Sequence, residues 1–140
     1  MRILYTAHAT ATSGRNGYVE TSDKHLMLEL QGLDMPKKES GTATNPEQLF
    51  ACAYAACFGS ALEAVAEKQH VDVSNAAVTV HVSLLKEDTG GFRIGAEVDV
   101  AIPQLDTNTI QNLVNRAHEV CPYSKATRGN IEVTVKAEAA

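Results

Sequence analysis

The most reactive side chains in this 140-residue chain are three cysteines, Cys52, Cys57 and Cys121. An odd number of cysteines, in a chain whose N-terminus lacks the apolar stretch of a signal peptide, is a poor disulfide framework. We therefore consider three roles for them: core residue, metal ligand or reactive thiol. Cys57 lies in an apolar run, where a thiol has a raised pKa and is inert. Its surroundings predict an inert core residue unless a cation lies against it.

Cys121 opens the run Cys-Pro-Tyr-Ser, which matches half of a thioredoxin or glutaredoxin active site. Those motifs open a helix after a strand, whereas Cys121 closes a predicted helix, so the local match is weak. Cys52 lies five residues before Cys57. At about 100° per residue, the two side chains would point about 140° apart on a helix. We expect Cys52 to be a core residue.

No metal site is predicted. The cysteines form no paired C-x-x-C knuckle among themselves or with His118, and the five histidines are scattered along the chain. The sequence also lacks glycine-rich phosphate loops, the G-x-S-x-G nucleophile elbow and the H-E-x-x-H zinc motif.

Two charged residues could set the protonation state of a thiol, although each also has a purely structural explanation. Arg15 lies in the turn-rich run 13–17, and Glu47 lies in the first turn of a predicted helix, where the helix dipole favours a carboxylate. Glu47 also shares a helical seam with Cys57 at 3-4-3-4-3 spacing. A lone acid on an apolar seam needs a partner, for which arginine is the natural choice. The seam consists of Glu47, Phe50, Tyr54, Cys57, Ala61 and Ala64.

These residues require a long central helix to position them. Asn45 is a suitable N-cap, Pro46 suits the first helical position, and Gln48 stands where a capping-box partner belongs. The pattern continues to about Lys68, with no charged residue between Gln48 and Leu62. Such a helix is predicted to be buried all round, at the centre of the fold.

Strands surround this helix in the predicted order βββ-α-ββ-α-β. A second helix is predicted from Asp106 or Thr107 to its end at Pro122, and residues 87–91 form a hairpin connection. The length is about that of one domain. We therefore predict a single α+β domain over residues 1–140 with a largely antiparallel sheet. The predicted strands cover residues 3–12, 18–21, 26–31, 78–84, 92–102 and 131–135.

Charge and composition exclude several classes of partner. Twelve Lys and Arg against 17 Asp and Glu give a net charge of −5, without a basic surface for nucleic acid or anionic membrane. Aromatic residues make up 5% of the chain and Trp is absent, so a stacking platform for single strands is excluded. The longest uncharged run, Gln48–Leu62, is shorter than the ~18 apolar residues of a membrane span. We expect a cytoplasmic protein that binds neither nucleic acid nor membrane.

Four segments of the chain resemble the organic hydroperoxide resistance (Ohr) branch of the OsmC-like superfamily. Two runs are specific to this branch: Asn-Pro-Glu-Gln-Leu-Phe over 45–50 and Cys-Pro-Tyr-Ser-Lys-Ala-Thr-Arg-Gly-Asn over 121–130. The resemblance covers nearly the whole chain, with strands and helices in the same order. Cys52 is a departure, because the branch more often has a small non-thiol residue there. The four segments are 9–17, 44–51, 54–58 and 118–130.

The resemblance implies a thiol peroxidase that acts on organic hydroperoxides. Cys57 matches the peroxidatic cysteine and Cys121 the resolving cysteine, while Arg15 and Glu47 match the pair that activates the thiolate. The implied assembly is an intertwined homodimer with active sites at the subunit interface. No metal, haem or flavin cofactor is implied. Electrons would come from a dithiol, namely the dihydrolipoyl groups of lipoylated proteins.

The residue types suit this chemistry. Only a thiolate attacks a peroxide, and an arginine held by a carboxylate can lower the pKa of Cys57 in a dry pocket. Attack leaves a sulfenic acid at Cys57, and Cys121 condenses with it to a disulfide before further oxidation. An apolar lining favours bulky or fatty hydroperoxides over hydrogen peroxide. We predict that this lining consists of Phe50, Tyr54, Phe58 and Met35.

The spacing of Glu47 and Cys57 predicts composite sites. On one helix they are separated by about 15 Å along the axis, which an arginine held by Glu47 would have to span. Two copies of the helix, packed antiparallel about an axis near residue 52, would bring Glu47 of one chain level with Cys57 of the other. We therefore predict that the cysteines of one chain meet the Arg15–Glu47 pair of its partner.

Two other functional classes remain open. A glutaredoxin-like oxidoreductase centred on Cys121 would keep its activity after Cys57→Ser and lose it after Cys121→Ser. A non-catalytic carrier of apolar ligands would consume no thiol with any hydroperoxide. An assay of thiol consumption separates these classes from the peroxidase.

Overall fold

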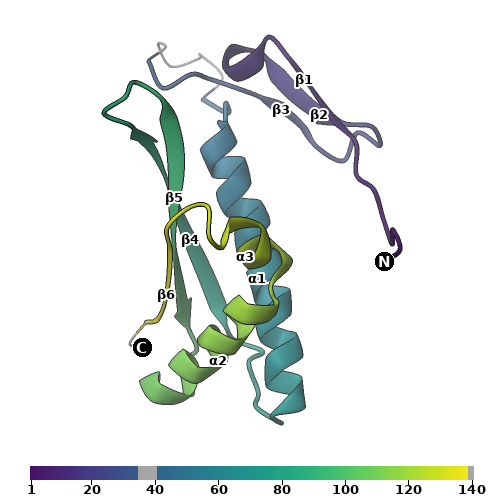
Figure 1. Cartoon of the computed structure of the whole chain (residues 1–140). Helices are drawn as coiled ribbons and strands as arrows, with labels where there is room; N and C mark the ends of the chain where they lie inside the picture. Colours follow the sequence, from purple (N-terminus) through teal and green to yellow (C-terminus); the bar gives the residue numbers. More distant parts are fainter. Residues whose placement is uncertain (35–40, 139–140) are drawn as a thin grey trace. The chain divides into compact units, whose positions relative to one another are not determined.

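The computed structural model describes residues 1–34 and 41–138, which form two compact units, Met1–Leu49 and Phe50–Ala140 (Figure 1). Met35, one of the predicted lining residues, lies outside the described residues. The single-domain assignment of residues 1–140 stays a prediction. Each unit is described below by itself.

The first unit is built on a three-stranded antiparallel sheet of order β1-β2-β3. The strand predicted over residues 3–12 forms only over its last four residues, while residues 1–8 are exposed and lack strand pairing. A 3-10 turn, η1, joins the first two strands. The elements are β1 (Ala9–Thr12), η1 (Gly14–Asn16), β2 (Tyr18–Thr21) and β3 (Met27–Glu29).

The turn between β1 and β2 is tightly constrained. Ser13 and Gly14 both adopt left-handed backbone conformations, with φ of 62° and 53°. At Gly17, a Cβ atom would lie 1.7 Å from the carbonyl oxygen of Thr12, so no larger residue fits without movement of the backbone. The turn therefore holds Arg15 on a backbone path that depends on glycine.

Helix α1 (Pro46–Lys68) begins at the predicted cap. The Gln48 backbone N–H donates to the Asn45 side-chain oxygen at 2.8 Å, and Pro46 occupies the first helical position. The Gln48 side chain does not complete a capping box in the predicted way. Its amide oxygen instead accepts a hydrogen bond from the Thr44 hydroxyl at 2.7 Å.

The prediction that α1 is buried all round is wrong for the single chain, because its neighbours in the second unit cover only one face. The opposite face is exposed at i, i+4, i+8 and i+11 spacing, and Ala64 of the predicted seam is exposed beside it. Cys52 lies on this exposed face, so its assignment as a core residue is also wrong. The exposed positions are Cys52, Ala56, Ser60 and Glu63, and the buried ones are Tyr54, Phe58, Ala61, Leu62, Val65 and Ala66.

By length and composition, α1 could cross a membrane, and it is the one such helix among the described residues. The apolar stretch is longer than the uncharged run Gln48–Leu62 indicated, because the apolar pattern continues past Glu63. The buried residues of α1 pack with β5 and α2 in the hydrophobic core of the second unit, as in the core helix of a globular domain.

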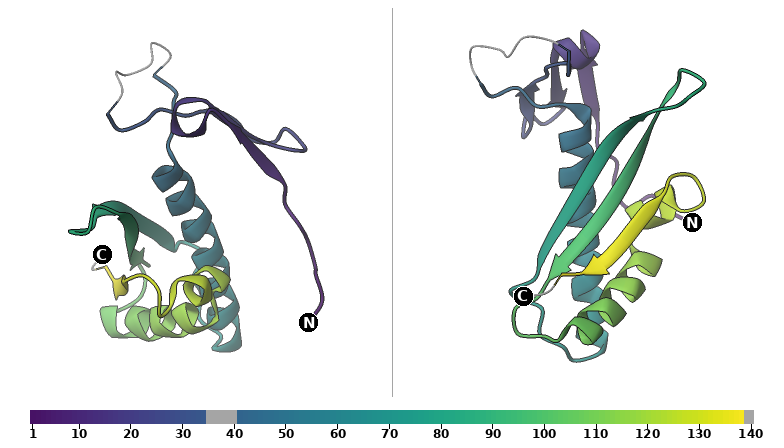
Figure 2. Two further views of the ribbon diagram at one scale, coloured as in Figure 1. Left: turned by 45° about the horizontal axis from the view of Figure 1, so that its top comes forward. Right: turned by 90° about the vertical axis from the view of Figure 1, so that its left-hand side faces the viewer.

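The second unit packs helices against a three-stranded sheet of order β4-β5-β6. Figure 2 shows these strands side by side, with the helices on one face of the sheet. Strand β5 pairs antiparallel with β4, as predicted, and parallel with β6. The chain reaches β6 through the helices α2 and α3. The elements are β4 (Ala77–Lys86), β5 (Phe92–Ala101), α2 (Thr107–Val120), α3 (Pro122–Thr127) and β6 (Val133–Ala137).

The short helix α3 was not predicted, because Pro122 was interpreted only as the end of the preceding helix. Pro122 in fact occupies the first position of α3, where its fixed φ and missing N–H are tolerated. The predicted start of α2 near Asp106 or Thr107 is confirmed, and the Asp106 side chain caps the helix by accepting from the Thr109 backbone N–H at 3.0 Å. Side chains from α1, β5 and α2, with Cys121, form the core.

Candidate active site

Cys57 and Cys121 meet in the second unit. The Cys121 thiol donates to Cys57 Sγ, with the two sulfur atoms 3.9 Å apart. Cys57 lies in the middle of α1 and is half-buried, whereas Cys121 is fully buried. A disulfide requires an S–S distance of about 2.04 Å, so closing it takes an approach of about 2 Å. The two cysteines to which sequence analysis gave roles therefore lie within reach of each other.

Cys121 owes its position to the junction of two helices. Its backbone N–H donates to the Ala117 carbonyl at 2.8 Å and ends α2, while its own carbonyl accepts from the Lys125 N–H at 3.0 Å and begins α3. A single extended residue between the helices, with ψ of 124°, thus turns the chain at Cys121. Regular backbone hydrogen bonds thus fix the backbone of Cys121 on both sides.

Burial raises the pKa of the Cys57 thiol, and the neighbouring Cys121 raises it further. A hydrogen bond from the Tyr123 backbone N–H partly offsets this effect by stabilising the thiolate. The net direction is still upward. Within the second unit, Cys57 therefore resembles an unactivated thiol, and a reactive thiolate requires a cation in addition.

Arg15 and Glu47 form such a cation–anion pair in the first unit. Arg15 Nη1 and Nη2 donate to the two Glu47 carboxylate oxygens at 2.9 and 2.6 Å, a bidentate arrangement. The pair raises the pKa of Arg15 and lowers that of Glu47. The Glu47 side chain is only 12% exposed, against 43% for Arg15. The pairing that the sequence predicted between these two residues is therefore present.

The Arg15 turn is also tethered to the segment that follows β3. The side-chain oxygen of Asn16 accepts a hydrogen bond from the Gly32 backbone N–H at 3.0 Å. Sequence analysis did not identify Asn16 as part of the site. Its place directly after Arg15, in a turn rich in Gly and Asn, is the only signal that the sequence offers.

The predicted lining residues differ in how deeply they are buried. Phe50, Tyr54 and Tyr123 form an aromatic cluster with ring centroids 5.7–6.1 Å apart. Tyr54 and Phe58 are fully buried in the core, so neither reaches the surface of the single chain. Phe50 and Tyr123 line a mainly apolar cavity of about 390 Å³. The cavity is completed by Ile94, Pro122, Ala126, Thr127, Asn130 and Ile131.

The Tyr54 hydroxyl belongs to a buried polar network that sequence analysis missed. It lies 2.9 Å from Ser124 Oγ, and His118 Nδ1 lies 2.8 Å from the same oxygen. Burial, with a smaller effect from Arg128, lowers the pKa of His118. These polar residues lie on α1, α2 and α3, and only the three-dimensional fold brings them together.

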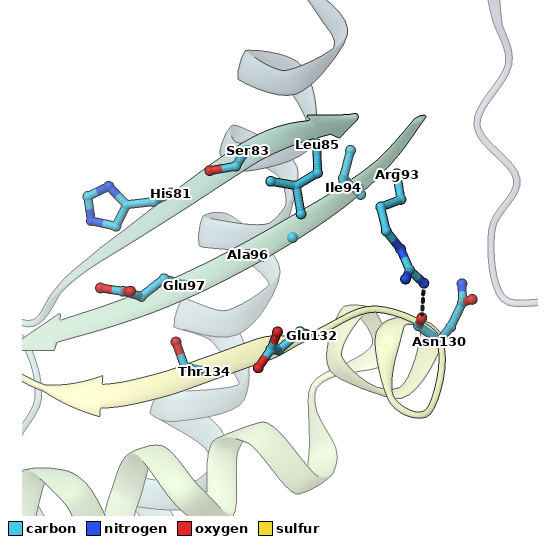
Figure 3. Close-up of a pocket in the computed structure, with 11 residues that line it drawn as sticks. His81, Ser83, Leu85, Arg93, Ile94, Ala96, Glu97, Asn130, Glu132 and Thr134 are labelled. Atoms are coloured by element: carbon cyan, nitrogen blue, oxygen red, sulfur yellow. Dashed lines mark hydrogen bonds between the residues drawn. The ribbon is translucent and has the colours of Figure 1, made fainter. Parts of the chain in front are cut away.

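A second, more polar cavity of about 560 Å³ lies over the opposite face of the β4-β5-β6 sheet and contains none of the predicted residues (Figure 3). Figure 3 shows His81 and Glu97 on neighbouring strands at one end of it. With Asp99 they offer three possible metal-ligand atoms within 4.8 Å of one another. The Lys136 ammonium, however, lies 2.5 Å from Glu97 and 3.5 Å from Asp99, so a cation of the chain itself already pairs with both acids.

Comparison with known proteins places these observations in context. The sequence profile of the family described as OsmC-like protein matches residues 38–136. The chain is 48% identical over 134 residues to the organic hydroperoxide resistance protein OhrB of Bacillus subtilis, covering 95% of this chain and 97% of that protein. It is 47% identical to an organic hydroperoxide resistance protein of Xanthomonas axonopodis pv. citri, covering 96% and 94%.

Solved structures agree with the predicted fold class. The crystal structure of B. subtilis OhrB matches with a TM-score of 0.87 and 45% identity, over 97% of this chain and 100% of that one. An organic hydroperoxide resistance protein from Legionella pneumophila matches with a TM-score of 0.85 and 45% identity, over 99% and 100%. The predicted α+β fold is confirmed.

Proposed function

The chain belongs to the family of OsmC-like proteins, and on that premise we propose that it acts in organic hydroperoxide resistance as a thiol-dependent peroxidase. The observation that carries the proposal is the 3.9 Å distance between Cys57 Sγ and Cys121 Sγ. It places a half-buried thiol that a substrate can reach beside a second, fully buried thiol. Such an arrangement suits a two-cysteine peroxidase cycle.

The cycle has three steps. The Cys57 thiolate attacks the terminal oxygen of a hydroperoxide ROOH, which forms Cys57–SOH and releases an alkoxide that takes up a proton to become the alcohol. The Cys121 thiol then displaces hydroxide from the sulfenic acid, giving the Cys57–Cys121 disulfide and water. A dithiol reductant finally reduces this disulfide by two thiol–disulfide exchanges and leaves as a disulfide itself.

Activation of Cys57 is assigned to Arg15. Burial raises the pKa of this thiol, so the thiolate needs a permanent positive charge that is weakly hydrated and held in place. Glu47 would hold the guanidinium by the two hydrogen bonds described above. With about 15 Å along the helix axis between positions 47 and 57, we propose that the pair acts on the thiolate of a partner chain in a homodimer.

The exposed face of α1 supports such a dimer. Cys52, Ala56 and Ser60 are small residues on the solvent-facing side of an otherwise apolar helix. Small side chains let two helices approach closely, and the residue 52 position on this face coincides with the predicted two-fold axis. The homodimer and its composite sites remain part of the proposal.

The aromatic cluster supports an apolar substrate. Phe50 and Tyr123 line the mainly apolar cavity, and Pro122, directly after Cys121, lines it too. Alkyl or fatty acid hydroperoxides would bury their chains on such a surface, whereas hydrogen peroxide is small and strongly hydrated. We propose Phe50 as a contact residue and Tyr54 and Phe58, which are fully buried, as the support beneath it.

The reductant and the compartment follow from the proposed cycle. A buried Cys121 favours a slender dithiol such as the dihydrolipoyl group of a lipoylated protein, and cysteines that cycle through a thiol state suit the reducing cytoplasm. The same burial argues against a glutaredoxin-like enzyme centred on Cys121, because its nucleophile would be inaccessible. We propose no metal, haem or flavin.

A turnover assay tests the proposal. Purified protein with a dithiol reductant should reduce an alkyl hydroperoxide, and should reduce it much faster than hydrogen peroxide at equal concentration. Arg2→Ala, which changes an exposed arginine far from the three cysteines in sequence, serves as a matched control. Thiol consumption that persists in Cys57→Ser would refute the peroxidase role and favour chemistry at another cysteine. An absence of any thiol consumption would favour a non-catalytic carrier.

A further inference from the structure

The hydroxyl of Ser124 connects all three helices of the second unit. It is fully buried and lies 2.9 Å from the Tyr54 hydroxyl on α1 and 2.8 Å from His118 Nδ1 on α2. Ser124 itself belongs to α3. One arrangement of protons satisfies both hydrogen bonds: Tyr54 O–H donates to Ser124 Oγ, and Ser124 O–H donates to neutral His118 Nδ1.

Helix α3 brings two groups to Cys57. Cys121, the residue that caps α3, places its sulfur 3.9 Å from Cys57 Sγ. The backbone N–H of Tyr123, in the first turn of α3, lowers the pKa of the same thiol and so favours its thiolate. The position of α3 relative to α1 therefore decides both contacts.

The Ser124 hydroxyl lies where it can set that position. Tyr54 precedes Cys57 by one helical turn on α1, and Ser124 follows Cys121 by one turn, so the hydroxyl–hydroxyl bond lies one turn away from the sulfur–sulfur contact on each helix. Other contacts hold α3 as well, notably a 2.6 Å hydrogen bond from Arg128 to the His118 carbonyl. Two hydroxyl contacts of Tyr54 join α3 directly to the helix that carries Cys57: the bond to Ser124 at 2.9 Å and a longer one to the Thr127 hydroxyl at 3.4 Å.

We infer that Ser124, held between Tyr54 and His118, is a positioning residue that keeps Cys121 poised to form the disulfide with Cys57. The inference rests on the proposed function in assigning Cys121 the resolving role. This positioning gives the Cys121 thiol a high effective concentration at the Cys57 sulfur. Without the buried bond, α3 would sample positions in which the sulfurs are too far apart to react, and Tyr54 and His118 would lose a buried partner.

An equilibrium with glutathione tests this without any hydroperoxide. Reduced protein and oxidised glutathione exchange to give the Cys57–Cys121 disulfide and two reduced glutathione molecules, and the equilibrium constant measures the effective concentration. We expect Ser124→Ala and Tyr54→Phe each to lower this constant about tenfold. The effect of the double variant should be smaller than the sum of the two single effects, because both single variants remove the Tyr54–Ser124 bond. Ser83→Ala, the same change at an exposed position on β4, should leave it unchanged.

A second readout follows one round of oxidation. After the sulfenic acid forms, attack by Cys121 competes with further oxidation by excess hydroperoxide. The fraction of Cys57 that ends as sulfinic acid should therefore rise several-fold in Tyr54→Phe and Ser124→Ala, as measured by mass spectrometry. This fraction does not depend on how fast the sulfenic acid formed.

The outcomes separate a positioning role from a merely structural one. If the variants melt at lower temperature but keep the wild-type equilibrium constant and sulfinic fraction, Ser124 only stabilises the fold and the inference is overturned. Tyr54→Phe keeps the ring and its packing, so it carries the test if Ser124→Ala does not fold. A wild-type protein that turns over no hydroperoxide would refute the proposed function, whereas the glutathione equilibrium would still decide the role of Ser124.

Discussion

Cys121 Sγ lies 3.9 Å from Cys57 Sγ, although the two cysteines are 64 residues apart in sequence; Cys121 directly precedes the short helix α3, and Cys57 lies in the middle of α1. The third cysteine is not part of this arrangement. Cys52 lies on the exposed face of α1, while Cys57 faces inward to the thiol of Cys121. The geometry therefore favours one intramolecular disulfide over the alternatives.

We predict that Cys57→Ser abolishes peroxidase activity, whereas Cys121→Ser allows one round of peroxide reduction and then accumulates sulfenic or sulfinic acid at Cys57. Peptide mass spectrometry of peroxide-treated wild-type protein should show the Cys57–Cys121 disulfide. Cys52→Ser is the matched control and should behave like the wild type. A disulfide between Cys52 and Cys57 would contradict the assigned roles.

Arg15→Ala should fold normally and react much more slowly with hydroperoxide. Burial raises the pKa of Cys57, so loss of the cation that offsets this effect should move the thiol's titration to higher pH. The measurement is the rate of alkylation of Cys57 as a function of pH, with Cys52→Ser as the background to avoid alkylation of the exposed thiol. An identical pH profile in Arg15→Ala and its parent would refute this role of Arg15.

Gly17→Ala should mimic Arg15→Ala although it leaves the guanidinium in place. The added Cβ would lie 1.7 Å from the Thr12 carbonyl oxygen, so the turn that carries Arg15 must move. We expect a large loss of turnover but an unchanged Cys57–Cys121 equilibrium with glutathione, because both cysteines lie in the other unit. Gly59→Ala is the control, because the added Cβ would meet nothing within 4 Å in the single chain. Full activity of Gly17→Ala would show that the turn tolerates displacement.

Mixed subunits test the composite site. Cys57→Ser and Arg15→Ala are each expected to be inactive or nearly so. Refolded together, they should recover activity, because one heterodimer site combines intact cysteines from the Arg15→Ala chain with an intact arginine from the Cys57→Ser chain. Sedimentation or light scattering would establish the dimer in parallel. No recovery on mixing, or a monomeric protein, would place each site within one chain.

Local sequence signals predicted much of the fold. The Asn45-Pro46 start of α1 and the Asp106 cap of α2 are local hydrogen-bonding patterns, and both are present. The alternation in β4 and β5 likewise led to an antiparallel pair. Such features need only neighbouring residues to form, which is why the sequence alone indicates them.

Features that depend on tertiary contacts were harder to predict from the sequence. Pro122 is compatible with both the end of one helix and the start of another, and only the chain path decides between them. The exposed face of α1 is not recognisable from composition over its first part, because Cys52, Ala56 and Ser60 are as small and uncharged as the residues of a buried face. Ser124 and His118 lie in the distinctive segment 118–130, but nothing in that segment indicates a hydrogen-bonded network with Tyr54, which lies about half a chain away.

The parallel pairing of β5 with β6 has a consequence for the order of folding. Residues 102–132, including α2 and α3, lie between the paired strands, so this contact is non-local and forms late relative to the β4-β5 hairpin. Until the crossover closes, α1 and its Cys57 can form while Cys121 has no fixed place beside it. In a partly folded chain, peroxide would then oxidise Cys57 before Cys121 lies beside it, and the sulfenic acid would be prone to irreversible oxidation. A reducing environment would therefore protect Cys57 of the newly made chain until Cys121 is in place beside it.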